Sequence, residues 1–234
     1  MKRSDLTLLA VIILAVTPFV VSEVPYQVYK ELNAAHPYCL AFVKFAILST
    51  LGELLGLRIK SGVYTSEGFG AAPRAILWGV YGVWIAIAMK TFSMGAPVMV
   101  ESLGVDGVVG AMKEGFSPEK LLGAFTISVM MNSLFAPIFM TLHKITDAHI
   151  VKNGGSICSL VRPIDMRSSF VNLDWDTQWS FVFMKTIPYF WIPAHTITFM
   201  LPASQQVLFA ALLSIALGVF LSIAVVISRN KSKA

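Results

Sequence analysis

The chain has few charged residues and few cysteines. Asp, Glu, Lys and Arg make up 13% of its 234 residues, well below the ~25% typical of globular domains. Together with a hydrophobic share of 56%, this scarcity argues against a water-soluble domain. The two cysteines, Cys39 and Cys158, allow at most one disulfide, and neither belongs to a Cys-x-x-Cys or metal-ligand pattern. We therefore expect neither a disulfide framework nor a cysteine metal site.

Catalytic and nucleotide-binding motifs are also absent from the sequence. It has no Gly-x-Ser-x-Gly, no phosphate-binding loop and no dinucleotide fingerprint. Asp174 and Asp176 have no His or third acid at ligand spacing, so we interpret them as an N-cap region rather than a metal site. The net charge of +5 is not gathered into one stripe, which disfavours nucleic-acid binding. We expect neither an enzyme nor a protein that holds a metal or a soluble cofactor.

Long apolar runs dominate what is present. A helix needs about 20 mostly apolar residues to cross a hydrocarbon core of about 30 Å, whereas barrel strands alternate over about ten residues. None of the runs alternates. We therefore predict an all-α integral membrane protein, a single domain built as a bundle of about six transmembrane helices. The predicted spans are residues 6–21, 38–57, 75–92, 121–142, 179–201 and 207–227.

The basic residues follow the positive-inside rule when all six spans are counted. With the N-terminus in the cytoplasm, the inside segments hold twelve Lys and Arg residues and the outside loops hold three. Since cytoplasmic loops are the ones enriched in these residues, both termini are predicted to be cytoplasmic. The inside residues are Lys2, Arg3, Arg58, Lys60, Arg74, Lys144, Lys152, Arg162, Arg167, Arg229, Lys231 and Lys233, and the outside ones are Lys30, Lys113 and Lys120.

The first run allows two interpretations. Met1-Lys2-Arg3, followed by an apolar run that ends at Ser22, resembles a secretory signal peptide. Cleavage would leave five spans and would not change the sidedness of the others, so charge counting does not decide between a span and a signal. Farther along, residues 105–113 fit a short helix at the outer interface.

Two ionisable residues lie inside predicted spans close to their cytoplasmic ends. Such groups need a partner, a wet cavity or access to the interface, because their insertion costs at least ~2.5 kcal/mol. Glu53 and Lys185 are predicted at similar depth, so they could form an ion pair that lines a polar cavity. In the alternative, Glu53 meets Arg58 at the surface while the stem of Lys185 extends to the headgroups.

The fifth predicted span is interrupted by proline. Pro188, Pro193 and Pro202 each remove a backbone donor and crowd the preceding turn, so the freed carbonyls need other partners at membrane depth. Neighbouring threonines could supply them. A proline-broken span with His195 near its centre is typical of a transport site. The alternative is that His195 only bridges helices.

The fourth predicted span carries a polar amide at its middle. Asn132, close to Ser128, should face protein, where it would either hydrogen-bond to another helix or line a pore. We take a set of four residues as the candidate polar lining: Glu53, Asn132, Lys185 and His195.

Small residues form stripes on two spans. Such stripes let helices approach closely, so they would pack either within the bundle or against a second copy of the chain in a homo-oligomer. The stripe on the sixth span consists of Ala210, Ser214, Gly218 and Ser222, and the stripe on the second consists of Gly52 and Gly56.

Several short motifs after the first span are shared with a known family. They are His36-Pro37 with Gly52-Glu53, Arg74-x-x-x-Trp78-Gly79, Phe135-Ala136-Pro137 with Asn132, and the spacing from Pro202 to Leu221-Ser222. In these motifs the chain resembles the peroxisomal membrane protein twenty-two / Mpv-seventeen family, in a divergent bacterial form. Glu53 stands where that family has Asp, and Asn132 stands where it usually has Gln.

The resemblance implies a channel-like function in a membrane. Gln206 and Leu217 replace the family's usual Arg and Trp, so an anion-selective site does not transfer directly. We predict a channel or transporter for a small solute, embedded in a lipid bilayer, the bacterial cytoplasmic membrane. The alternative is a structural or regulatory membrane protein without transport activity.

Overall fold

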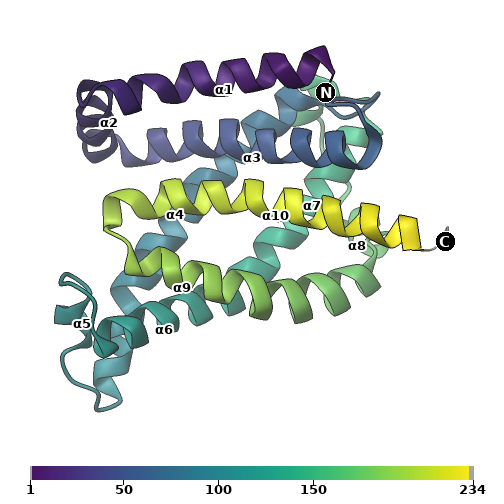
Figure 1. The fold of residues 1–234 in the computed structure, drawn as a ribbon. Helices are drawn as coiled ribbons and strands as arrows, with labels where there is room; N and C mark the ends of the chain where they lie inside the picture. Colours follow the sequence, from purple (N-terminus) through teal and green to yellow (C-terminus); the bar gives the residue numbers. More distant parts are fainter. Residues whose placement is uncertain (1, 232–234) are drawn as a thin grey trace. The chain divides into compact units, whose positions relative to one another are not determined.

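The computed structural model describes residues 2–231 and is almost entirely helical in that range (Figure 1). Helices make up 83% of the structure, and no strand occurs among residues 2–231, which confirms the predicted all-α class. The elements are α1 (Arg3–Val21), α2 (Val24–Ala35), α3 (Pro37–Ser61), α4 (Ala71–Ser102), α5 (Val108–Ala111), α6 (Pro118–Leu134), α7 (Ala136–Lys152), η1 (Ile157–Leu160), α8 (Met166–Val171), η2 (Thr177–Trp191), α9 (Ile192–Met200) and α10 (Ala203–Lys231).

Contacts divide the chain into two compact units. The first unit ends at Leu40 and holds α1, α2 and the first turn of α3, and the second begins at Ala41. α1 is apolar and has no buried residue, and Pro18 lies within its last turn. Every residue of the candidate site described below belongs to the second unit.

Four helices among residues 2–231 are long and apolar enough to cross a membrane. They are α1, α3, α4 and α10, and α6 with α7 makes a fifth if that bent pair is one span. Helices of this length and composition are typical of a membrane protein. The predicted span at 179–201 is helical, as η2 and α9, but it is not among these candidates.

Proline accounts for the bend within the fourth predicted span. The axes of α6 and α7 differ by 45°, and Phe135 lies between the two helices. Pro137 stands in the first turn of α7, where the missing N–H and the ring disfavour continuation of the preceding helix. The single span predicted for 121–142 is therefore two helices at an angle.

The proline-rich fifth stretch is helical but changes its winding. η2 has the wide turns of a π-helix and contains Pro188, and α9 has ordinary α-turns with Pro193 near its start. The Ile192 carbonyl accepts hydrogen bonds from Ser128 Oγ at 2.7 Å and from Thr196 Oγ1 at 2.8 Å. The Ser128 hydroxyl thus links α6 to the backbone of the proline-containing run.

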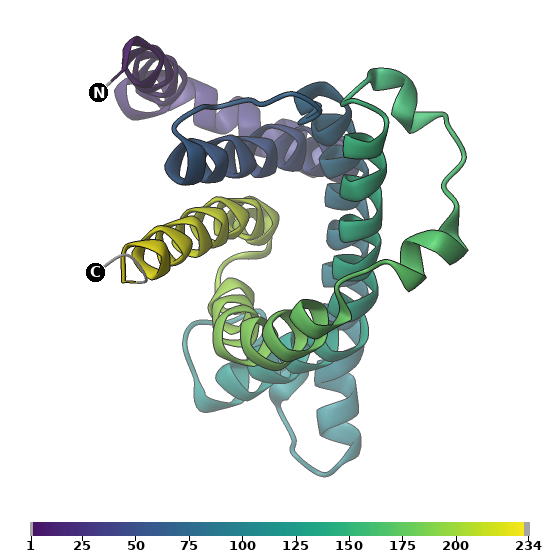
Figure 2. The same ribbon diagram turned by 90° about the vertical axis from the view of Figure 1, so that its right-hand side faces the viewer.

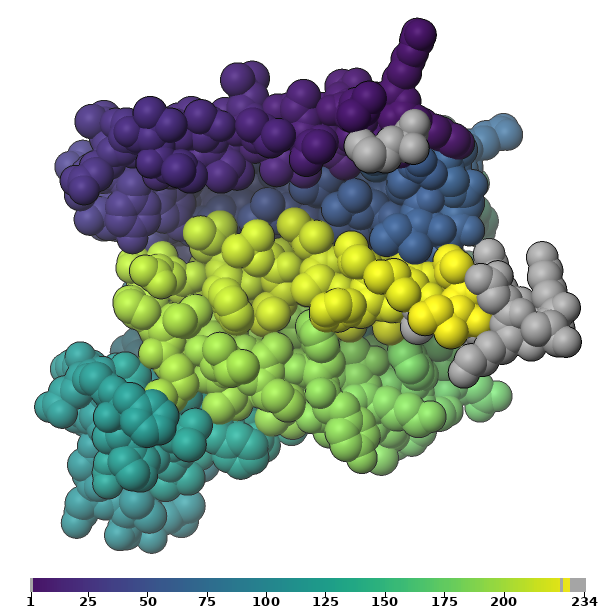
Figure 3. Space-filling view, in the orientation of Figure 1, coloured from purple at the N-terminus to yellow at the C-terminus, as the bar shows by residue number. Residues whose placement is uncertain are grey.

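Within the second unit, α10 lies beside the run of η2 and α9. Figure 3 shows α10 along one face with the green helices η2 and α9 next to it, and Figure 2 shows α7 steeply inclined to α3, α10 and η2. The hydrophobic core of this unit includes Ala96, Ala124, Phe199 and Ala211. Other core residues also line the cavity described below: Phe45, Ile85, Met131 and Ala210.

Candidate functional site

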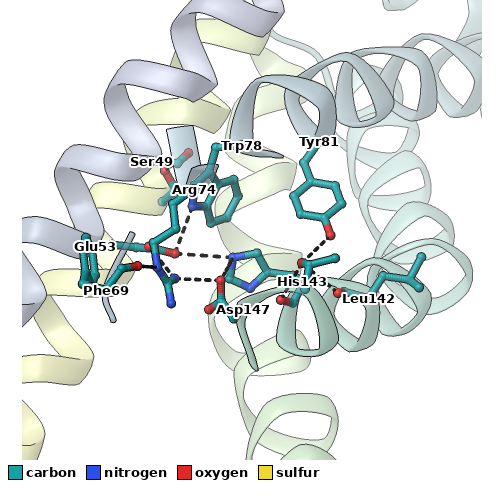
Figure 4. A network of polar contacts seen from close by, with 11 residues as sticks. Ser49, Glu53, Phe69, Arg74, Trp78, Tyr81, Leu142, His143 and Asp147 are labelled. Carbon is teal, nitrogen blue, oxygen red and sulfur yellow. Dashed lines mark hydrogen bonds and ion pairs between the residues drawn. The ribbon is translucent and has the colours of Figure 1, made fainter. Parts of the chain in front are cut away.

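A polar cluster of three residues, Glu53, Arg74 and Asp147, joins α3, α4 and α7 (Figure 4). Arg74 Nη1 donates to Glu53 Oε2 at 2.8 Å and to Asp147 Oδ1 at 2.7 Å, and Arg74 Nε donates to the Phe69 carbonyl at 2.7 Å. The Arg74 side chain is 8% exposed, against 20% for Glu53 and 24% for Asp147. One guanidinium therefore connects two carboxylates at a largely buried position, the arrangement in which ion pairs are screened least.

Aromatic rings and His143 surround this cluster. Trp78 Nε1 donates to Glu53 Oε1 at 2.9 Å, and the Trp78 ring packs on the His143 ring with centroids 4.5 Å apart. His143 Nε2 lies 3.4 Å from Glu53 Oε1. Glu53 is therefore in contact with a guanidinium, an indole N–H and an imidazole.

Three of these side chains could also offer ligand atoms to a metal ion. The ligand atoms of Glu53, His143 and Asp147 lie within 4.8 Å of one another, and nitrogen with carboxylate oxygens suits several divalent cations. Arg74 already neutralises both carboxylates through Nη1. A metal ion would compete with this guanidinium, so the geometry fits an ion-pair cluster better than a metal centre.

An elongated cavity of about 260 Å³ begins beside this cluster. Its lining includes residues of α10 from Ala210 to Leu221, which are separated by roughly 16 Å along the helix axis at ~1.5 Å per residue. Exposed Lys144 lines it at the end near Glu53 and His143. Most of the wall is apolar, with aromatic rings from α7 and η2.

A buried polar pair lines the same cavity farther along the bundle. Asn132 Nδ2 lies 3.0 Å from His195 Nδ1, and Asn132 Oδ1 lies 3.2 Å from the same nitrogen. Asn132 is 1% exposed and His195 is 7% exposed. The Trp191 ring stacks on the His195 ring with centroids 5.1 Å apart. This pair is the one polar-to-polar side-chain link that we identify between α6 and α9 in the described part of the chain.

The structure brings together three of the four residues taken as the candidate polar lining. Glu53, Asn132 and His195 line one cavity, but Lys185 is exposed on η2 and is not part of the lining. Neither interpretation of Glu53 matches the contacts seen, because its ion-pair partner is Arg74 rather than Lys185 or Arg58. The sequence indicates how deep a residue lies along a span. It does not indicate which neighbouring helix that residue meets.

The two stripes of small residues face each other across α3 and α10. Ser49 Oγ lies 2.8 Å from Ser214 Oγ, and a Cβ added to Gly52 would stand 2.9 Å from Ile215 Cα. A Cβ on Gly56 would stand 2.9 Å from Ser222 Oγ. The stripe residues of both helices therefore contact each other within one chain. Ala210, at the start of the sixth-span stripe, is buried and belongs to the hydrophobic core.

Sequence reasoning did not identify Arg74, His143 and Asp147 as site residues. The available signals were local: Arg74 and Trp78 are one helical turn apart, as are His143 and Asp147, and such pairs share a helix face. Nothing in the spacing indicated that these two faces meet Glu53. The two cysteines, Cys39 and Cys158, are both free and exposed.

Comparison of the chain with protein-family models, with curated proteins and with solved structures found no match. The family resemblance therefore rests on the short sequence motifs alone.

Proposed function

We propose that the protein is a multi-pass membrane protein that conducts or carries a small solute through the cavity next to α3, α7, η2 and α10. The observation that supports this most is the shape of the cavity. It extends roughly 16 Å along α10 at ~1.5 Å per residue, about half of a hydrocarbon core of about 30 Å. It contains both the Glu53 end of the ion-pair cluster and the buried Asn132–His195 pair.

Sidedness adds a direction to this proposal. We propose six spans with both termini in the cytoplasm of a bacterial cell, which would place Lys144 and Glu53 at the cytoplasmic end of the cavity. The hydrophobic core around Phe199 and Ala211 would then close the outer end. A cavity that holds a polar pair beside a proline-broken helical run is typical of transporter binding sites.

We also propose kinship with the peroxisomal membrane protein twenty-two / Mpv-seventeen family. Arg74 and Glu53, which stand in two of the shared motifs, form an ion pair, so the motifs describe residues that act together. The alternative function, a structural membrane protein without transport, is favoured by the close α3–α10 packing and would remain if no solute passes.

Flux through proteoliposomes tests the proposed function. Purified protein would be reconstituted in vesicles preloaded in turn with potassium, chloride, phosphate, glycerol and benzoate, with heat-inactivated protein as the control. We expect release of at least one solute to be faster than in the control vesicles. If all five solutes are released at the control rate, the transport proposal fails.

The two cysteines test the proposed sidedness directly. Both thiols are free and exposed, and the proposed topology places Cys39 outside and Cys158 inside. A membrane-impermeant maleimide added to intact cells should label Cys39 and leave Cys158 unmodified until the cells are lysed. Cys39→Ser and Cys158→Ser variants assign the label, and the reverse pattern would contradict the sidedness.

A further inference from the structure

Two buried hydrogen-bond donors in the cavity wall have no partner. In the described part of the chain, Gln178 Nε2 and Trp191 Nε1 are buried side-chain atoms without a hydrogen bond. Both residues line the cavity, and Gln178 is 2% exposed. Buried polar groups are paired in the great majority of cases, so each unpaired donor in the cavity wall is a position where an acceptor atom that enters the cavity can bind.

The indole of Trp191 defines the chemistry of that ligand. Trp Nε1–H can only donate, whereas the Gln178 amide can present either its oxygen or its nitrogen. A molecule that contacts Trp191 must therefore carry a hydrogen-bond acceptor. The stacked His195 ring and the neighbouring side chains of Met131 and Phe135 give the rest of this molecule an apolar environment.

The volume of the cavity limits the size of the ligand. An apolar cavity of ~150 Å³ is large enough to bind benzene, and this cavity measures about 260 Å³. The space is therefore adequate for one six-membered ring with a small substituent. A phosphorylated sugar or a nucleotide would exceed it and would leave most of its polar groups against an apolar wall.

We infer that the cavity binds a compact molecule with an apolar, ring-sized body and an acceptor oxygen, and that this oxygen accepts a hydrogen bond from Trp191 Nε1. The inference names the solute class for the proposed transport, and as a statement about solutes it rests on that function. The binding itself can be measured without any flux.

Binding of two probes that differ in the acceptor tests the inference. Para-fluoroacetophenone carries a ketone oxygen, and para-fluorotoluene has a ring of similar size without one. Their dissociation constants for the purified, detergent-solubilised protein would be measured by fluorine NMR. Trp191→Phe keeps an aromatic ring and removes the N–H together with two ring carbons, so the lost packing affects both probes. The lost hydrogen bond affects the ketone alone, and the variant should therefore weaken ketone binding about tenfold more than toluene binding, the value of one net hydrogen bond.

The matched control is Trp179→Phe on the same helix. Trp179 is 61% exposed and does not line the cavity, so this variant should bind both probes as the wild type does. Partition of the probes into detergent is the same for all three proteins and cancels in the comparison. Because the Trp191 N–H bonds to no protein group, Trp191→Phe should fold normally.

Two outcomes would overturn the inference. One is equal weakening of both probes by Trp191→Phe, which would mean that Trp191 contributes packing only. The other is the absence of saturable binding by the wild type. If the ketone binds as expected but proteoliposomes release no solute, the transport proposal fails while the assignment of the cavity stands.

Discussion

Replacing Arg74 by methionine should destabilise the protein more than any other single substitution in the polar cluster. The substitution removes donors to Glu53, Asp147 and the Phe69 carbonyl, as well as the stacking of the guanidinium 4.7 Å from the Phe69 ring centre. Methionine preserves much of the apolar stem, so the change tests mainly the charge and its hydrogen bonds.

The magnitude follows from the exposure of the carboxylates that are left behind. Removing one partner of a fully buried ion pair costs about 3–5 kcal/mol, because an uncompensated charge remains. Glu53 and Asp147 are 20% and 24% exposed, so water reaches them in part and the cost decreases. We expect Arg74→Met to lower the free energy of unfolding by about 2–3 kcal/mol.

Unfolding by sodium dodecyl sulfate in mixed micelles, followed by tryptophan fluorescence, measures this difference. Glu53→Gln in the Arg74→Met background should recover roughly 1 kcal/mol, since one of the two unpaired charges is then gone. Arg167→Met is the control, because Arg167 is exposed on α8 and should change stability by less than about 0.5 kcal/mol. If Arg74→Met costs no more than this control, the ion-pair cluster is not a stabilising feature.

Three further predictions test the remaining contacts. Gly52→Ala should cost about 1–3 kcal/mol through separation of α3 and α10, because the new Cβ would meet Ile215 Cα at 2.9 Å; Gly95→Ala, where nothing lies within 4 Å, should stabilise by up to about 1 kcal/mol. Thermal unfolding of both glycine variants in one detergent measures this, and melting temperatures that shift in the same direction for both would contradict the prediction. Asn132→Leu should cost about 1–3 kcal/mol by leaving His195 Nδ1 unpaired, and adding His195→Phe should restore much of the loss because both polar groups are then removed; no recovery in the double variant would argue against the pair. Asp174 accepts hydrogen bonds from the Thr177 N–H and Oγ1, which lower the pKa of its carboxyl. The ionised form therefore stabilises the fold above the ordinary pKa, and this contribution disappears on acidification through the lowered pKa. Carboxyl-carbon NMR should show Thr177→Val raising the pKa of Asp174, and an unchanged titration would refute the assignment.

The helices that carry the site could largely be predicted from the sequence. A long apolar run in lipid has no water to bind its backbone N–H and C=O groups, so it forms a helix in which these groups bond to each other. Each of the six predicted spans coincides with helical segments of the structure. α2 (Val24–Ala35) was not predicted, since its polar residues, including Lys30 and Glu31, give it no long apolar run. The short helix expected within residues 105–113 is present as α5.

The site was only partly predictable, for a geometric reason. Asn132 and His195 stood out individually because amides and imidazoles are costly inside spans, yet their pairing across 63 positions depends on how α6 and α9 rotate against each other. The same holds for Arg74, which is 21 positions from Glu53 and 73 from Asp147. Helical periodicity gives neighbours within one helix, whereas the partner across the bundle is decided by packing.

Chemical blockage of the cavity tests the central claim most directly. The starting protein carries Cys39→Ser and Cys158→Ser and so has no cysteine of its own. Leu217→Cys then places one thiol on the cavity wall, and a bulky methanethiosulfonate reagent is added after reconstitution. Leu212→Cys, at a position on the same helix that is 44% exposed and does not line the cavity, is the control. Modification of the cysteine at position 217 should abolish the solute flux, and modification at position 212 should leave it unchanged. Flux that continues after modification at position 217 would show that the solute does not pass through this cavity.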